Sequence, residues 1–134
     1  MDCVFCKIIL GDIPSCKVYE DENSLVFLDI NPVNHGHTLI IPKKHFASIE
    51  DAPEEDLREV IKIVKKIGKA IKSGLKVQGY NVMINNGYVA GQIVSHLHFH
   101  LVPRLVGDGL KLWPKGKYGE GEADLILKKI KSAL

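Results

Sequence analysis

Residues 92–104 read Gln-Ile-Val-Ser-His-Leu-His-Phe-His-Leu-Val-Pro-Arg and place histidines at positions 96, 98 and 100. Histidine alternates with apolar residues, and a period of two residues predicts a β-strand rather than a helix. On a strand the three imidazoles share one face, while Leu97, Phe99 and Leu101 point to the opposite face and into a core. The stretch therefore predicts a core strand that also carries a candidate functional face.

Three interpretations of the histidine row compete. The first is a solvated strand face that carries histidine by chance. The second is metal binding, because His-x-His on a strand can direct two ring nitrogens at one ion. The third is nucleophilic catalysis, in which one imidazole attacks an electrophile while its neighbours orient it, a role that suits a side chain with a pKa near neutrality. Local spacing leaves the second and third interpretations open.

The composition is that of a globular domain. Apolar residues make up 46% and charged residues 25% of the 134 residues, which excludes a disordered chain and allows a real core. The net charge of +2 gives no electrostatic argument for nucleic-acid binding. No apolar run reaches the length of a membrane span, and no signal peptide is visible. We expect one cytoplasmic domain over residues 1–134, with neither nucleic acid nor membrane as a partner.

The rest of the chain predicts short strands and helices in alternation. We expect helices at residues 3–10, 53–74 and 123–133, and strands at 16–20, 25–29, 37–42, 80–85 and in the histidine stretch. In the long helix, i, i+3, i+4 spacing assigns one buried face to Leu57, Val60, Ile61, Val64, Ile67 and Ile71. The pattern predicts an α+β fold, an antiparallel sheet of about five strands with one long helix and short terminal helices.

The cysteines leave two interpretations open. Cys3-x-x-Cys6 can supply two ligands to zinc, but one such pair is half a site, and buried thiols explain it equally well. Cys16 is interpreted as a packing residue. In a cytoplasmic protein, three cysteines favour free thiols or metal ligands over disulfides.

The histidine stretch also resembles a known family. His96-Leu97-His98-Phe99-His100-Leu101-Val102 is similar to the signature of the histidine triad (HIT) superfamily, His-φ-His-φ-His-φ-φ, where φ is apolar. Asn85 and the pair Gly91-Gln92 stand where the family has an amide residue and a Gly-Gln step. Residues 37–45 resemble the segment that precedes the family's long helix. The resemblance covers most of the chain and implies a single HIT domain that forms a homodimer.

The resemblance implies nucleotide chemistry. Family members are nucleotide hydrolases and nucleotidyl transferases that act at an α-phosphate, so His98 would be the nucleophile and would hold the nucleotidyl group covalently. His100 and His37 would flank the phosphate, and Asp29 would accept hydrogen bonds from the ribose. The implied substrate is a purine nucleotide conjugate, such as a phosphoramidate or a dinucleoside polyphosphate. The other residues that the resemblance assigns to substrate are Phe5, Ile8, Phe27, Ile30, Asn85, Gly91 and Gln92.

A structural zinc is implied in the same way. In a subset of HIT relatives, zinc is held by the positions that correspond here to Cys3, Cys6, His45 and His96. Two sulfurs and two nitrogens make a closed tetrahedral site with no open position for a substrate water. The resemblance implies no organic cofactor. Catalytic zinc held by the histidine triad itself is the alternative.

One position departs from the family pattern. Position 93 is usually Ser or Thr, whose hydroxyl can help the leaving group, whereas Ile93 cannot donate a hydrogen bond. This departure supports the alternative of a nucleotide-binding or partner-binding module with little turnover. The tail carries Trp113-Pro114, as in members that cleave phosphoramidates, but Pro103-Arg104 resembles the branch that cleaves dinucleoside polyphosphates. The leaving group and the preferred base stay open.

Overall fold

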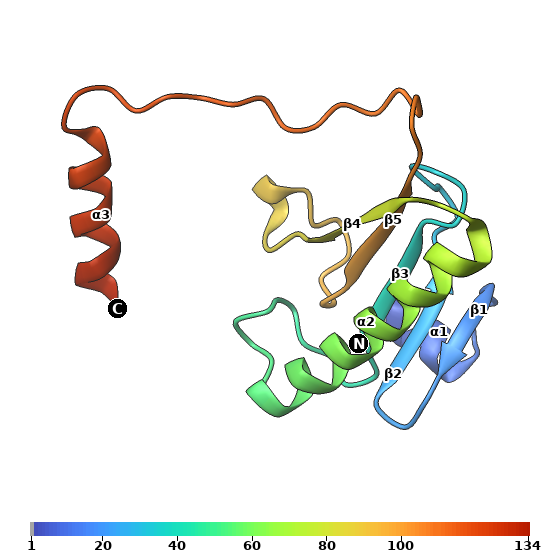
Figure 1. The fold of residues 1–134 in the computed structure, drawn as a ribbon. Helices are drawn as coiled ribbons and strands as arrows, with labels where there is room; N and C mark the ends of the chain where they lie inside the picture. The colour runs from blue at the N-terminus through green and yellow to red at the C-terminus, as the bar shows by residue number, and fades with distance from the viewer. Residues whose placement is uncertain (1) are drawn as a thin grey trace.

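The computed structural model describes residues 2–134 and contains a five-stranded antiparallel sheet with the spatial order β1-β2-β3-β5-β4 (Figure 1). The strands are β1 (Lys17–Glu20), β2 (Ser24–Leu28), β3 (Thr38–Pro42), β4 (Gly79–Ile84) and β5 (Phe99–Arg104). Each pair of neighbours is antiparallel. The predicted α+β class and sheet are therefore confirmed.

The three predicted helices are also present. They are α1 (Val4–Leu10), α2 (Glu54–Leu75) and α3 (Glu122–Ala133). A short 3₁₀ helix, η1 (Tyr88–Ala90), lies in a segment to which the sequence assigned no helix or strand. Gly11 ends α1 in the left-handed conformation, with φ of 85°, which glycine adopts without steric cost. Of the helices within residues 2–134, none combines the length and apolarity that crossing a bilayer requires.

Alternate residues of β2 and β3 face different helices, as the period of a strand requires. Val26 and Ile40 belong to the core on the α2 side, while Phe27 and Leu39 pack with Phe5 of α1 on the other side. In Figure 1, α2 crosses one face of the sheet and α1 lies behind it. The strands β2 and β3 are thus buried on both faces, and the α1 side of the sheet is the one that carries the histidines.

One assignment in the buried face of α2 was wrong. Ile61 is 53% exposed, whereas Ile63, which we did not assign to that face, is only 8% exposed. The buried stripe runs through Val60, Ile63, Ile67 and Ile71. Because successive helical residues turn by about 100°, Ile61 lies at the edge of this stripe and faces solvent.

The histidine strand is shorter than expected. β5 begins at Phe99, so His96 and His98 precede the strand and only His100 lies in it. The reason is that the Leu97 N–H donates to the Phe46 carbonyl at 2.6 Å, outside the strand ladder. The expected division of faces nevertheless holds, because the apolar residues at 97, 99 and 101 lie in the α2-side core.

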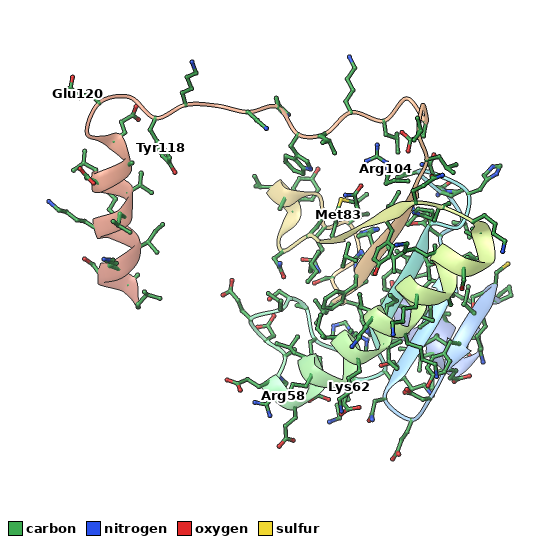
Figure 2. All side chains as sticks on the ribbon, viewed as in Figure 1. Arg58, Lys62, Met83, Arg104, Tyr118 and Glu120 are labelled. Carbon is green, nitrogen blue, oxygen red and sulfur yellow. The ribbon has the colours of Figure 1, made fainter. Side chains whose placement is uncertain are left out.

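Beyond β5, the chain leaves the sheet as an extended arm that ends in α3, away from the rest of the molecule (Figure 1). Figure 2 shows Tyr118 and Glu120 on this arm, and Tyr118 is 68% exposed. No residue of α3 is buried. That residues 1–134 act as one domain stays a prediction.

Candidate functional site

A cavity of about 480 Å³ opens on the α1 side of the sheet. Its volume lies in the range of cavities that hold small organic ligands. The wall is mostly apolar and combines α1, the end of β2, the segment after Gly91 and two of the histidines. The lining residues are Val4, Phe5, Ile8, Ile13, Pro14, Ser15, Phe27, Leu28, Asp29, Ile30, Asn31, Leu39, Gly91, Ile93, Val94, His98 and His100.

His98 is held in one tautomer. Its Nδ1 lies 2.6 Å from the backbone carbonyl oxygen of His96, and a carbonyl only accepts hydrogen bonds. Nδ1 therefore carries the proton, and the neutral ring keeps an unprotonated Nε2. Burial lowers the pKa of His98, which keeps the ring neutral at pH 7. The ring of Phe5 packs edge-on against it, with centroids 5.1 Å apart. His98 is thus a fixed, neutral imidazole at the cavity wall.

His37 and His100 form a second ordered pair. The Val33 backbone N–H donates to His37 Nδ1 at 3.1 Å, so the neutral His37 ring carries its proton on Nε2. That Nε2 lies 3.0 Å from His100 Nδ1, which must then accept, leaving the proton of His100 on its own Nε2. Within residues 2–134, His100 Nε2 is buried and has no hydrogen-bond partner. Burial, with His98 and His37 nearby, lowers the pKa of His100 to about 4.

Asp29 supplies a carboxylate at the same cavity. One oxygen, Oδ1, accepts from the Asn31 backbone N–H at 2.8 Å. The other, Oδ2, lies 3.7 Å from His37 Nε2, which is too long for a hydrogen bond. Burial lowers the pKa of His37, so the two groups do not form an ion pair at pH 7. Asp29 therefore keeps acceptor capacity for a ligand, and Ile30 beside it is 90% exposed at the rim.

Two cysteines and two histidines from distant parts of the chain meet beside the cavity. Cys3 Sγ lies 3.5 Å and Cys6 Sγ 3.6 Å from His96 Nδ1, and Cys6 Sγ lies 3.4 Å from His45 Nδ1. A tetrahedral zinc, with Zn–S bonds of about 2.3 Å and Zn–N bonds of about 2.0 Å, holds sulfur and nitrogen about 3.5 Å apart. The four donor atoms all lie within 4.8 Å of one another, so this cluster can bind a metal ion.

The tautomer of His96 suits the same cluster. Its Nε2 lies 2.8 Å from the Pro42 carbonyl oxygen and must donate to it, which leaves Nδ1 unprotonated and facing the two sulfurs. Metal-bound histidines commonly use such a carbonyl to fix the ring. The free nitrogen is therefore Nδ1 in His96 and Nε2 in His98, and the two rings belong to different candidate sites.

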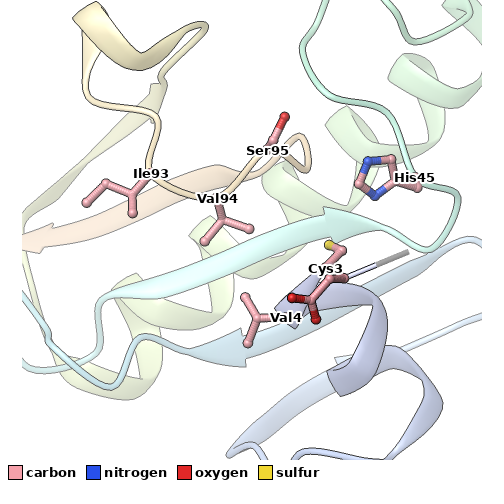
Figure 3. Close-up of a pocket in the computed structure, with 7 residues that line it drawn as sticks. Cys3, Val4, His45, Ile93, Val94 and Ser95 are labelled. Atoms are coloured by element: carbon pink, nitrogen blue, oxygen red, sulfur yellow. The ribbon is translucent and has the colours of Figure 1, made fainter.

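A second cleft, of about 440 Å³, adjoins this cluster (Figure 3). It is lined by Asp2, Cys3, Val4, His45, Ile93, Val94 and Ser95. Figure 3 shows Ile93 and Val94 on one side and His45 with Cys3 on the other. Ile93 and Val94 also line the larger cavity, and Ile93 is 90% exposed. The departure from the family pattern therefore lies at the boundary between the two clefts.

The structure brings most of the expected site residues together. Eight of them line the cavity: Phe5, Ile8, Phe27, Asp29, Ile30, Gly91, His98 and His100. His37 is not among the lining residues and contacts the site through His100, since its Nε2 lies 3.0 Å from His100 Nδ1. The two amides bond to backbone groups. Gln92 accepts from the Gly87 N–H at 2.8 Å and donates to the Ala47 carbonyl at 2.6 Å, and Asn85 donates to the carbonyl of Gly91, at the cavity wall, at 3.4 Å. Asn85 and Gln92 are not among the lining residues.

Sequence reasoning missed the groups that fix the rings. These are backbone atoms, the N–H of Val33 and the carbonyls of Pro42 and His96, and no residue type signals them. It also missed apolar wall residues such as Ile13 and Val94, because neither lies in a helix or strand whose period would assign it to a face.

Comparison with known proteins identifies the family. A HIT domain matches residues 11–106. An uncharacterised HIT-like protein of Methanocaldococcus jannaschii is 50% identical over 129 residues, 96% of this chain and 98% of that protein. An adenosine 5'-monophosphoramidase of Schizosaccharomyces pombe is 43% identical over 121 residues, 90% of this chain and 81% of that protein.

Solved structures agree. The crystal structure of a HIT family member from Bacillus subtilis matches with a TM-score of 0.91 at 42% identity, covering 100% of this chain and 98% of that one. A zinc-bound histidine triad protein from Mycobacterium smegmatis matches with a TM-score of 0.79 at 40% identity, covering 100% and 99%. The fold that the sequence suggested is therefore confirmed, and the chain belongs to the HIT domain family.

Proposed function

We propose that the protein is a nucleotide hydrolase that cleaves a purine nucleotide conjugate at its α-phosphate through a covalent nucleotidyl-His98 intermediate. The observation that carries the proposal is the tautomer of His98: a buried, neutral ring whose Nε2 is unprotonated, at the wall of a cavity of nucleoside size. A neutral imidazole is a good nucleophile and, once phosphorylated, a good leaving group. The Schizosaccharomyces pombe relative, named an adenosine 5'-monophosphoramidase, supports this substrate class.

The reaction has two displacement steps at phosphorus. His98 Nε2 forms a bond to the α-phosphorus, and the bond to the leaving group breaks, so that the leaving group departs with the electron pair and takes a proton from solvent. Solvent recovers a proton in the second step, from the attacking water. Water then attacks the phosphorus of the nucleotidyl-histidine. The P–N bond breaks, the nucleoside monophosphate leaves, and the neutral imidazole is restored with its proton on Nδ1, still bonded to the His96 carbonyl.

His100 stabilises the charge on phosphate oxygens. Its Nε2–H is buried and lacks a protein partner among residues 2–134, so a non-bridging oxygen can accept from it without displacing another bond. A donor already aimed before the reaction needs no reorganisation, and removing one such donor typically slows a reaction by about 10²–10³-fold. His37 acts through His100, because its Nε2–H fixes the His100 tautomer.

The nucleoside end of the substrate fits the remaining wall. The aromatic and aliphatic side chains of Phe5, Ile8 and Phe27 offer apolar surface to a base. Asp29 keeps acceptor capacity on Oδ2 for ribose hydroxyls. Gly91, which has a φ of 95° and no side chain, allows close approach of a phosphate to the backbone.

We propose that the metal cluster holds a structural zinc. The residues fit the ion, because the S···N separations match a tetrahedral Cys₂His₂ set and the Pro42 carbonyl fixes the free nitrogen of His96. Such a closed site would tie α1 to the segment that carries His98 and takes no part in the chemistry. The zinc-bound Mycobacterium smegmatis relative supports this assignment.

The assembly and the domain follow the family resemblance. We propose a homodimer in which residues 1–134 of each chain form one domain. The long arm and α3 support this proposal, since Leu125, Ile126, Leu127 and Ile130 of α3 are all exposed in the single chain. Light scattering that gives the mass of one chain at micromolar concentration would contradict it.

The function is tested by turnover of a panel, with His98→Ala as the comparison. The panel holds an adenosine phosphoramidate, a diadenosine polyphosphate and a nucleotidyl ester. Hydrolysis of any of them by the wild type, lost in His98→Ala, supports the enzyme. A binding module with little turnover is the second candidate, favoured by Ile93, which brings no hydroxyl to the boundary of the two clefts. Nucleotide binding without turnover by the wild type would favour that candidate.

A further inference from the structure

An ion-pair network outside the cavity, formed by Arg104 and Asp108, holds the loop between β2 and β3 that carries the Val33 N–H. Its centre is Asp108, whose side chain is 6% exposed and lies next to Arg104 at the end of β5. Arg104 Nε donates to Asp108 Oδ2 at 2.8 Å and Arg104 Nη2 donates to Oδ1 at 3.1 Å. The backbone N–H groups of Leu105 and Leu110 donate to the same carboxylate. Figure 2 shows Arg104 where the strand passes into the arm.

Asn34 connects this ion-pair network to the histidines of the candidate site. Its Nδ2 donates to Asp108 Oδ2 at 3.1 Å and to the Pro103 carbonyl at 2.9 Å. The backbone of the same residue is bound to the site, because the His37 N–H donates to the Asn34 carbonyl at 3.0 Å. Val33, the residue before Asn34, donates its N–H to His37 Nδ1. Val33 itself is 50% exposed, so packing alone does not hold this turn.

We propose that Asn34, anchored by Asp108, is a positioning residue that sets the proton positions of His37 and His100. This inference rests on the proposed function only for its effect on turnover. The order of bonds runs from Asn34 through the Val33 N–H to His37, and from His37 Nε2–H to His100 Nδ1. The series ends at the His100 Nε2–H, which has no hydrogen-bond partner among residues 2–134. If the Val33 N–H leaves His37 Nδ1, the proton of His37 can move to Nδ1, and His100 then loses its fixed donor.

Arg104 also provides a matched control. Its Nη1 donates to Asn81 Oδ1 at 2.8 Å, so Asn81 is a second half-buried amide that is hydrogen-bonded to the same ion-pair network. Asn81 lies in β4, and in the described part of the chain its side chain makes no hydrogen bond to the loop of Val33. Asn34→Ala and Asn81→Ala therefore remove comparable amides from one ion pair, but only the first releases the loop.

The experiment measures imidazole ¹⁵N–¹H correlations, steady-state turnover and thermal stability of the wild type, Asn34→Ala and Asn81→Ala. We expect Asn34→Ala to change the tautomers of His37 and His100 and to lower kcat by about tenfold to hundredfold. KM should change less than kcat. Asn81→Ala should keep wild-type tautomers and turnover while losing a similar amount of thermal stability.

The outcomes are separable from those of the proposed function. Wild-type tautomers in Asn34→Ala, or turnover no lower than that of Asn81→Ala, would overturn the inference. If the wild type hydrolyses no nucleotide conjugate, the tautomer measurement still decides it. Asn34→Asp serves as the second variant if Asn34→Ala does not fold, because it keeps the size of the side chain. It removes both Nδ2 hydrogen bonds and places a like charge beside Asp108. We expect the same change in the tautomers of His37 and His100.

Discussion

His98 Nδ1 lies 2.6 Å from the carbonyl oxygen of His96, the residue two positions before it. This short bond links the two sites, because the same His96 directs its own Nδ1 at the cysteines. One residue thus contributes its side chain to the candidate metal cluster and its backbone to the tautomer of His98, the proposed nucleophile. The alternation of histidines thus brings residues of both candidate sites into five residues of chain.

Acid pH should weaken the fold through His100. Burial lowers its pKa from about 6.5 to about 4, so between these values the unfolded chain binds a proton that the folded protein does not. The free energy of unfolding that this residue contributes is fully present above about pH 6.5 and falls as the pH drops toward 4. Urea unfolding at pH 7, 6, 5 and 4 should show a smaller fall for His100→Asn than for the wild type. Parallel curves for the two proteins would show that His100 does not titrate in this way.

Zinc should bind in a ratio of about one per chain and should stabilise the fold. Cys6→Ala removes one of four donors, and a loss of about 3 kcal/mol would lower the melting temperature by about 10 °C. The interpretation of Cys16 as a packing residue was wrong, because its thiol is exposed. Cys16→Ala is therefore the control, since Cys16 lies outside the cluster. Elemental analysis and calorimetry should therefore separate the two variants. Equal metal content in both would contradict the assignment.

Ile93→Ser should raise turnover most for conjugates with poor leaving groups. Ile93 lies at the boundary of the two clefts and has no proton to give, whereas a serine hydroxyl can donate a hydrogen bond to a departing nitrogen. We expect a gain of about tenfold or more for a phosphoramidate with an alkylamine leaving group, and less for a nitrophenyl ester. Val89→Ser provides the control, since Val89 is equally apolar and fully exposed on η1. A gain of the same size for both esters and amidates would argue against leaving-group assistance.

Ile63→Ala should destabilise the protein far more than Ile61→Ala. Ile63 lies in the core between α2 and the sheet, and truncating a buried isoleucine typically costs about 2–5 kcal/mol. Ile61 is 53% exposed, so its truncation should cost under about 1 kcal/mol. Chemical denaturation of both variants measures the difference. Similar losses in the two variants would contradict the burial of Ile63 and the exposure of Ile61.

Much of the fold was predictable from local patterns. The apolar stripe of α2, the strand alternation and the turn residues each reflect a period that the backbone imposes, so the elements and the α+β class followed from them. The start of β5 was not predictable, because it depends on the Leu97 N–H bonding to Phe46, a residue far away in sequence. Ile61 was misassigned because one residue at the edge of a helical stripe differs little in pattern from one within it.

The candidate site was predictable in its side chains but not in its proton positions. The cysteine and histidine spacing, read through the family resemblance, named the four residues that the structure gathers into one cluster. The tautomers depend on the carbonyls of His96 and Pro42 and on the Val33 N–H, which every residue type possesses. Asn85 and Gln92 were assigned to substrate by the resemblance, but in the structure their amides bond to backbone groups whose positions only the fold determines.

The most direct test of the mechanism is mass spectrometry of the protein quenched at alkaline pH during turnover of an adenosine phosphoramidate. Alkaline conditions preserve a phosphorus–nitrogen bond to histidine. We expect an adenylyl group on His98 in the wild type and none in His98→Ala, with a higher fraction of adduct in variants that slow the second step. Hydrolysis that proceeds with no adduct on His98, or with the adduct on another residue, would contradict the assignment of His98 as the nucleophile.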